Sequence, residues 1–174
     1  MQGGEERAFR RYQCDFDALF REHYPEIVRF LAARVGSREV GADLASDVFV
    51  EAFKRVRFLR WRGKPVLAWL YRVASNMAAD HLKRAMREQP VAEVDEAAVD
   101  VFETLPERDA VARALRRMPP DYQLVVHLRL VEGYPFEDVA TVMGRTAGAC
   151  QMLMLRAGRA LRAALEQEGI RAGA

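Results

Sequence analysis

The sequence contains few cysteines and no long apolar run, and each scarcity excludes a class of protein. Cys14 and Cys150 are the only cysteines among 174 residues, too few and too far apart for a disulfide framework or a zinc site. No apolar run approaches the roughly 18 residues of a membrane-spanning helix, and the chain does not start with a charged-then-apolar leader. We therefore expect a cytoplasmic protein with no membrane insertion.

Groupings typical of catalysis are also missing. The three histidines, His23, His81 and His127, are scattered along the chain. There is no phosphate-binding loop, no pair of carboxylates in a polar cleft, and no nucleophile beside a base. We expect the histidines to be satisfied core or boundary residues. The sequence thus predicts no enzyme, no cofactor, no metal site and no small-molecule substrate.

The charge is unevenly distributed, although its net value is only +2. Residues 1–88 carry 17 basic and 12 acidic side chains, residues 89–109 carry 1 and 7, and residues 110–174 carry 9 and 6. Two basic blocks therefore flank an acidic one. The basic blocks suit a polyanion such as nucleic acid, whereas an acidic connector would avoid one. The balance of 51% apolar and 30% charged residues is that of a globular protein.

Apolar spacing predicts an all-α fold of two small helical domains joined by an acidic linker. We expect a frayed tail over residues 1–15, a helical domain over 16–88, a linker over 89–107, and a second domain over 108–174. In the first domain, one helix runs from Phe16 to Val35, bent or interrupted near Pro25, and stops at Gly36. A second helix covers about residues 38–59, and a third runs from Pro65 to about Arg87.

The third helix has one apolar and one polar face. The apolar face comprises Val66, Leu70, Val73, Ala74, Met77 and His81, and the opposite face comprises Trp69, Arg72, Asn76, Asp80, Lys83 and Arg87. Aromatic rings beside arginine stack on unpaired bases. Just upstream, basic residues from Lys54 to Lys64 are interleaved with Phe53, Phe58 and Trp61. We interpret this surface as one that holds a separated nucleic-acid strand; the alternative is a solvated face with both indoles partly in the core.

The second helix carries a line of acids. Its predicted buried residues are Leu44, Ala45, Val48, Phe49, Ala52, Phe53 and Val56. On the other side Asp43, Asp47 and Glu51 recur every four residues, and like charges at that spacing repel by a few tenths of a kcal/mol each. Stability does not explain this ridge. It indicates either a basic partner surface or a merely soluble face, and the sequence leaves both open.

The second domain contains a helix-turn-helix pattern. Helices are expected over residues 108–118 and 122–131, the latter capped by Asp121 and ended by Gly133. Ala140 provides the small residue where two helices cross, and Gly144 provides the left-handed turn. Further residues pack or cap the two helices, namely Val139, Met143, Cys150, Leu153 and Thr146. We expect Cys150 to be a small core residue rather than a reactive thiol.

Taken in order, these segments resemble the bacterial RNA polymerase sigma factors of the extracytoplasmic-function (ECF) group, which have regions two and four. The first domain matches through HYPEIVRFLAARV, GADLASDVFVEAF and AWLYRVASNMAADHLKR. The second matches through ALRRMPPDYQLVVHLRLVEG, FEDVATVMG and LRAGRALRAALE. The resemblance implies a protein that binds core RNA polymerase, directs it to promoters and assists melting of the duplex.

The resemblance also assigns residues. The second helix would dock on core polymerase through Asp43, Asp47, Val50 and Glu51, although Ser46 stands where a glutamine is common. The melted minus-ten element would be read by loop residues Arg60, Trp61, Arg62 and Lys64, and by helix residues Trp69, Arg72, Asn76, Asp80 and Lys83. The acidic linker would thread into the polymerase's active-site channel.

The second helix of the helix-turn-helix departs from the family pattern, because it is apolar where relatives are polar and basic. Residues available to upstream promoter DNA are Arg145, Thr146, Gln151, Met152, Leu155, Arg156 and Arg159. Gln151 suits adenine, methionine and leucine suit thymine methyl groups, and the arginines suit phosphates. We predict weak or relaxed upstream recognition. Some of these apolar side chains could instead contact a protein such as an anti-sigma factor.

Two other functions are compatible with parts of the sequence. A stand-alone helix-turn-helix regulator of duplex DNA explains Ala140 and Gly144, but it leaves the aromatic-basic face and the acidic ridge without a task. A helical adaptor that binds only protein explains the apolar second helix, but it does not explain the segregation of charge.

Overall fold

The computed structural model describes residues 2–56, 58, 66–88 and 106–167. All regular structure in these ranges is helical, which confirms the all-α prediction. The chain divides into two compact units, Met1–Glu93 and Val94–Ala174. This division falls inside the predicted linker, but residues 89–105 lie outside the described ranges and the linker itself stays a prediction.

The N-terminal segment is a helix, so the prediction of a frayed tail is wrong. Helix α1 (Gln2–Cys14) buries Phe9 and Tyr12. These two aromatics are three residues apart and therefore share one face of the helix. The next helix, α2, is capped by the Asp15 carboxylate, which accepts a hydrogen bond from the backbone N–H of Ala18 over 3.1 Å. Because the segment is mostly polar, its composition did not indicate that two of its aromatic residues are buried.

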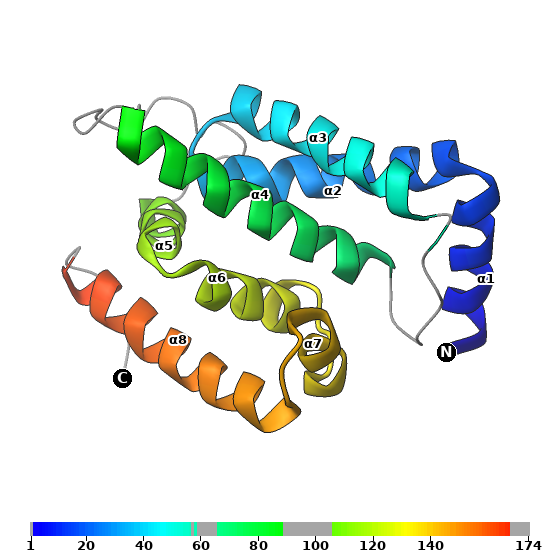
Figure 1. The fold of residues 1–174 in the computed structure, drawn as a ribbon. Coiled ribbons are helices and arrows are strands. Elements are labelled where there is room, and N and C mark those ends of the chain that lie inside the picture. The colour runs from blue at the N-terminus through cyan, green and yellow to red at the C-terminus, as the bar shows by residue number, and fades with distance from the viewer. Residues whose placement is uncertain (1, 57, 59–65, 89–105, 168–174) are drawn as a thin grey trace. The chain divides into compact units, whose positions relative to one another are not determined.

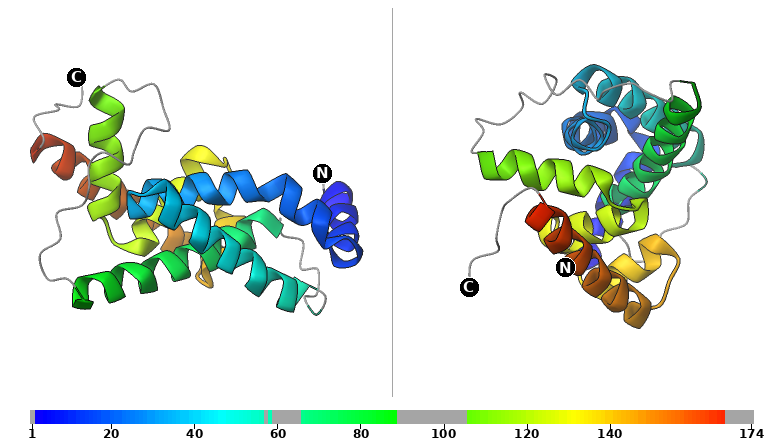
Figure 2. Two further views of the ribbon diagram at one scale, coloured as in Figure 1. Left: turned by 90° about the horizontal axis from the view of Figure 1, so that it is seen from above. Right: turned by 90° about the vertical axis from the view of Figure 1, so that its left-hand side faces the viewer.

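Unit 1 is completed by three long helices that lie side by side (Figures 1 and 2). They are α2 (Phe16–Val35), α3 (Arg38–Val56) and α4 (Val66–Glu88). Gly36 ends α2 with φ of 76°, as predicted from its position. Pro25 does not interrupt α2, and it lies on the exposed side, where water can serve the carbonyl that loses its helical partner.

Helix α4 is rotated relative to the apolar face predicted for it. Val66, Leu70 and Ala74 are buried as expected, but Val73, Met77 and His81 are only half-buried. The core instead receives a neighbouring set of residues, Ala68, Tyr71, Ser75 and Ala78. Ser75 accepts a hydrogen bond from Arg34 of α2, and the Tyr71 ring packs edge-on against Phe30 at 5.1 Å. Hydropathy alone ranks serine and arginine as surface residues, so it placed the face wrongly.

Unit 2 consists of α5 (Pro106–Arg117), α6 (Pro120–Val126), a π-helical turn η2 (His127–Val131), α7 (Phe136–Met143) and α8 (Ala147–Gln167). The prediction of one helix over 122–131 capped by Asp121 is wrong. The helix starts at Pro120 with Pro119 as its N-cap, and it widens into η2 before Gly133. Asp121 lies in the first turn of α6, where its carboxylate pairs with Arg145.

The helix-turn-helix prediction is confirmed by α7, α8 and the turn between them. Gly144 ends α7 in the left-handed conformation with φ of 65°, and Ala140 is buried. Thr146 accepts a hydrogen bond at Oγ1 from the backbone N–H of Ala149 over 3.2 Å, which caps α8. The predicted packing residues are all buried, namely Val139, Met143, Cys150 and Leu153.

Candidate nucleic-acid interface

The outward face of α4 presents the polar set expected from the sequence. Asn76, Asp80 and Lys83 are exposed, while Trp69 and Arg72 are half-buried. Lys83 Nζ lies 3.9 Å from Asp80 Oδ1, and both side chains are 68% exposed. Because Ala68, Tyr71 and Ala78 hold the other side of α4 in the core, the indole and the amide are kept at the surface. The face offers one aromatic ring together with several hydrogen-bond donors.

Four loop residues are assigned to the same strand-binding surface, namely Arg60, Trp61, Arg62 and Lys64. They lie outside the described residues, so their assignment stays a prediction. The described residues on either side of this loop are Phe58 and Val66. Helix α3 ends, and α4 begins, at the same end of unit 1 (Figure 1). The described residues that flank this loop therefore lie at one end of unit 1.

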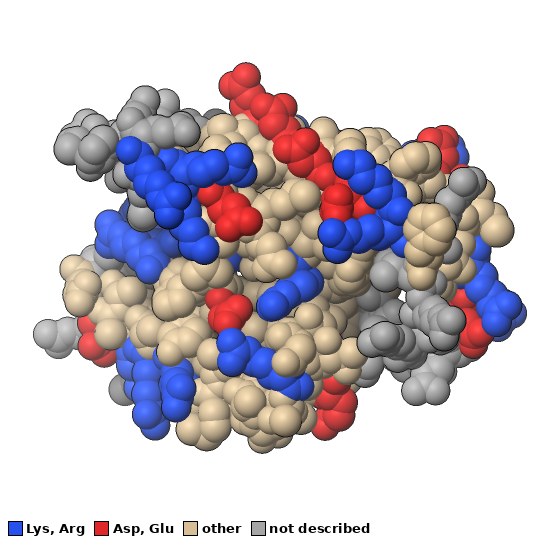
Figure 3. Space-filling view, viewed as in Figure 1, with Lys and Arg blue, Asp and Glu red and all other residues tan. Residues whose placement is uncertain are grey.

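The acidic ridge lies along the exposed side of α3. Asp43 and Asp47 are exposed, and neither has a hydrogen-bond or ion-pair partner among the residues that the structure describes. Glu51 differs, because its carboxylate pairs with Arg55 and is only 24% exposed. Figure 3 shows acidic side chains following one another across this part of the molecule. Two uncompensated carboxylates in a row attract a basic partner.

An aromatic cluster beside the ridge was missed by sequence reasoning. The Phe49 ring is buried and packs against Phe20 at 5.1 Å and Tyr24 at 5.7 Å, two rings that stack on each other at 4.6 Å. Phe16 packs edge-on against Phe53 at 5.1 Å. Phe53 is nevertheless 56% exposed, so its assignment to the buried side of α3 is wrong. Phe53 lies three residues after Val50, so the two side chains share one side of α3, and both are exposed.

The exposed face of α8 contains five of the seven residues assigned to upstream DNA, and the other two, Arg145 and Thr146, lie just before the helix. Gln151, Met152, Leu155, Arg156 and Arg159 are all exposed, and Met152 and Leu155 are exposed by 51% and 55%. The side chains that would enter a DNA groove are therefore mainly apolar. This arrangement supplies one amide for base recognition and two arginines for phosphates.

Arg145, which was also assigned to upstream DNA, forms an ion pair within unit 2. Its Nη2 lies 2.5 Å from Asp121 Oδ2, so the guanidinium joins the turn before α8 to the first turn of α6. The side chain is 43% exposed and can still approach a phosphate on its open side. Its carboxylate partner weakens that attraction.

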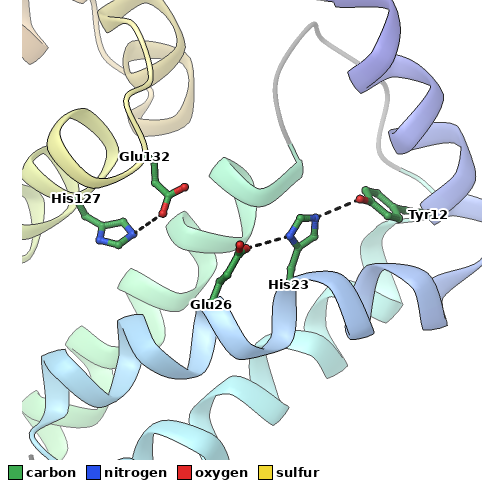
Figure 4. Close-up of polar contacts among 5 residues, drawn as sticks. All are labelled: Tyr12, His23, Glu26, His127 and Glu132. Atoms are coloured by element: carbon green, nitrogen blue, oxygen red, sulfur yellow. Dashed lines mark hydrogen bonds and ion pairs between the residues drawn. The ribbon is translucent and has the colours of Figure 1, made fainter. Parts of the chain in front are cut away.

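His23 and His127 each lie beside a carboxylate, which suits a structural role. His23 is hydrogen-bonded at Nδ1 to Glu26 over 3.2 Å and at Nε2 to the Tyr12 hydroxyl over 3.3 Å, and His127 lies 3.3 Å from Glu132 (Figure 4). Burial and a hydrogen bond to Glu22 raise the pKa of Tyr12.

Burial also raises the pKa of the Cys150 thiol, which keeps it neutral in the core of unit 2. No group of histidine, cysteine and carboxylate side chains within the described ranges could hold a metal ion. Likewise, none of the described helices is long and apolar enough to span a bilayer.

Comparison with known proteins agrees with the two-unit fold. The family model for Sigma-70 region 2 matches residues 19–88, and the model for Sigma-70, region 4 matches residues 108–161. The ECF RNA polymerase sigma factor BldN of Streptomyces coelicolor is 32% identical over 169 residues, which cover 92% of this chain and 61% of BldN. The RNA polymerase sigma-H factor of Pseudomonas aeruginosa is 28% identical, over 95% of this chain and 90% of that protein.

A solved structure shows the same fold. The sigma factor RpoE from Bartonella quintana, in complex with the anti-sigma factor NepR, superposes with a TM-score of 0.70 at 20% identity, over 87% of this chain and 97% of RpoE. The chain belongs to the sigma-70 family, with its regions 2 and 4 in units 1 and 2 respectively. Within that family its relatives assign it to the extracytoplasmic-function group.

Proposed function

We propose that the chain binds core RNA polymerase, directs it to specific promoters and assists melting of the duplex there. The observation that carries the proposal is the pairing of two different exposed faces on unit 1. The α3 face carries Asp43 and Asp47, which have no partner among the described residues, and the α4 face carries half-buried Trp69 and exposed Asn76. One face suits a basic protein surface and the other suits an unpaired strand, so a single unit could couple enzyme to promoter.

The α3 face would bind core polymerase through Asp43, Asp47, Val50 and Glu51. Val50 is 53% exposed between Asp47 and Glu51 and adds an apolar contact to this face. Glu51 would have to share its carboxylate with Arg55. We therefore expect Asp43 and Asp47 to contribute most of the electrostatic attraction. This attraction should weaken as salt is raised.

The α4 face and the preceding loop would hold the melted minus-ten strand. Taking a base out of the stack costs a few kcal/mol, and stacking on an aromatic side chain returns about 1 to 3 kcal/mol per base. Trp69 provides the ring on the helix, and the Asn76 amide can donate to and accept from a base edge. The basic loop residues would neutralise phosphates and hold the strand against this face.

Unit 2 would bind upstream duplex DNA through α8, with low base discrimination. Gln151 is the one exposed side chain on the first three turns of α8 with both donor and acceptor groups. Met152 and Leu155 could contact thymine methyl groups, which distinguishes fewer bases than a set of polar contacts does. The same apolar pair offers a contact for an anti-sigma factor, which we propose as a second protein partner.

We further propose that the chain has no catalytic activity of its own and acts in the cytoplasm, where polymerase and promoter DNA occur together. The stand-alone regulator remains the alternative to test. It gives no role to the acidic α3 face or to the region 2 match, and no contact in the structure favours it.

Run-off transcription with purified core polymerase tests the proposal. A transcript from one defined start, made only when the chain is added, supports it. A shifted duplex without polymerase, together with no transcript, would instead support the stand-alone regulator. Failure in both assays would leave a protein-binding role.

A further inference from the structure

Helix α1 belongs to none of the surfaces assigned above, and it ends before residues 19–88, which the Sigma-70 region 2 model matches. It is nevertheless a packed part of unit 1. Phe9 and Tyr12 are 5% and 3% exposed, and the Tyr12 hydroxyl lies 3.3 Å from Nε2 of His23 on α2. The helix is therefore firmly held, although the family match does not account for it.

The outward side of α1 is basic. Arg7, Arg10 and Arg11 are all exposed. Their spacing of three and four residues places them on one face of the helix, opposite the buried pair of aromatic residues. Glu6 is the only acid among the described side chains of α1, which are those of residues 6–14, and it pairs with Arg10 over 2.9 Å. Three guanidinium groups therefore share this side of α1 with one carboxylate.

Helix stability does not explain this basic face. Arg7 and Arg11 are four residues apart, and like charges at that spacing repel by a few tenths of a kcal/mol. Arg11 lies in the last turn and gains from the helix dipole, but that gain does not require a second cation beside it. Arg11 also has no ion-pair partner among the residues that the structure describes. A partner that carries phosphates would replace the repulsion with attraction.

The position of α1 connects its basic face with promoter DNA. Gln13 donates from Nε2 to the carbonyl of Val56 over 3.1 Å, which ties the end of α1 to the end of α3. Figure 1 shows α1 at the end of unit 1 where α3 ends and α4 begins. Lys54, in the last turn of α3, is exposed and has no ion-pair partner within the described part of the chain. The candidate strand-binding face begins at this same end, with Trp69 in the first turn of α4.

We propose that α1 binds phosphates of promoter DNA beside the melted segment, through Arg11 and Arg7. This inference rests on the proposed function and adds to it a DNA contact that lies outside the region 2 match. DNA fits the face better than an acidic protein surface does, because the face adjoins the candidate strand-binding surface. The guanidinium group matches a phosphate in charge and geometry, and a packed helix loses little conformational freedom on binding.

The first test measures promoter binding by holoenzyme made with the full chain, at salt concentrations from about 50 to 200 mM. Each phosphate contact contributes about 0.9 to the slope of log affinity against log salt for duplex DNA. Arg11→Gln should therefore reduce that slope by about 1, and Arg7→Gln combined with Arg11→Gln should reduce it by about 2. Arg11→Lys keeps the positive charge and should keep the wild-type slope.

A matched control comes from the other end of α3. Arg38→Gln removes one exposed cation from the first residue of this helix, about 27 Å along the axis from Val56. The slope should be that of the wild type in this variant. Affinity for core polymerase and the melting temperature are measured for every variant, and neither should fall.

Cys14 provides a second readout. It is exposed and lies three residues after Arg11, on the same side of α1, whereas Cys150 is buried. A photo-crosslinker attached to Cys14 should therefore react with promoter DNA at the edge of the melted segment when holoenzyme is bound.

An unchanged salt slope in the double variant would overturn the inference, as would an equal change in Arg38→Gln. Crosslinking from Cys14 to polymerase subunits alone would also overturn it. A loss of core affinity in Arg11→Gln would assign the face to an acidic protein surface instead of DNA. Failure of the wild-type chain to bind core polymerase or open the promoter would refute the proposed function, so the two failures are distinguishable.

Discussion

The guanidinium of Arg34 on α2 donates a hydrogen bond from Nη1 to Oγ of Ser75 on α4 over 3.0 Å, and both side chains are buried. The bond joins two residues that are 41 positions apart in the sequence. It holds Ser75 inward, and the 3.6-residue repeat then places Asn76 outward. A buried polar contact therefore acts with the apolar packing of α4 to orient the helix whose other face is the candidate strand-binding surface.

Substitution of Ser75 by alanine should destabilise unit 1 by about 1 to 3 kcal/mol, because Arg34 loses a buried acceptor. Urea unfolding followed by tryptophan fluorescence measures this loss selectively, since Trp61 and Trp69 are the only tryptophans and both belong to unit 1. Arg29→Ala, on an exposed position of α2, is the matched control and should change stability by less than about 0.5 kcal/mol. Equal effects of the two substitutions would contradict the structural role of the bond.

Gly41 on α3 should not tolerate alanine. A Cβ atom there would lie 2.7 Å from the Ala32 backbone nitrogen and 2.8 Å from its Cα, so α2 and α3 would have to move apart. We expect a loss of about 1 to 3 kcal/mol from this overpacking. Gly158→Ala on α8 is the matched control, since nothing lies within 4 Å of its Cβ position, and it should stabilise unit 2 by about 0.5 to 1 kcal/mol. A lower melting temperature for Gly41→Ala and a higher one for Gly158→Ala, both followed by the helical circular dichroism signal, would support both expectations.

Neutralising the ridge should weaken binding to core polymerase. The double substitution Asp43→Asn with Asp47→Asn removes two exposed charges and should lower affinity by about tenfold at low salt, with a smaller effect at high salt. Asp17→Asn on α2, whose side chain is 82% exposed, removes an acid elsewhere on unit 1 and should leave affinity unchanged. The idea fails if the Asp17 variant loses as much affinity as the double variant in a fluorescence binding assay.

Promoter recognition should depend more on α4 than on α8. Asn76→Ala should reduce permanganate reactivity of the opened region by about tenfold, a loss equal to one good base contact. Gln151→Ala should leave the choice among promoters with altered upstream sequences nearly unchanged, because a single amide among apolar side chains supplies little base discrimination. The reverse pattern would assign specificity to unit 2.

The Cys150 thiol should lower stability at alkaline pH. Burial raises the pKa of the Cys150 thiol in the folded state. The free energy that the buried protonated thiol contributes to folding is therefore fully present below the ordinary thiol pKa, and it is lost as pH rises towards the raised value. Unfolding free energy measured between pH 7 and 10 should therefore fall, and Cys150→Ala should reduce that slope. Iodoacetamide should modify exposed Cys14 well before Cys150 in the folded chain. Equal rates for the two thiols would contradict the buried assignment.

The sequence by itself determined the features that depend on local spacing. Gly36 and Gly144 end their helices because both take the left-handed conformation that other residues avoid. Trp69 and Asn76 share a face of α4 because they are seven residues apart on a helix. Cys150 enters the core because it faces the crossing with α7.

Only the tertiary structure decided which faces are buried and which partners polar groups find. Tyr12 is buried on α1 beside His23 of α2, and Ser75 is buried where Arg34 reaches it from another helix. Arg145 is paired with a carboxylate 24 residues away. Periodicity along one helix fixes which residues lie together, but burial depends on residues distant in the sequence that no local pattern contains.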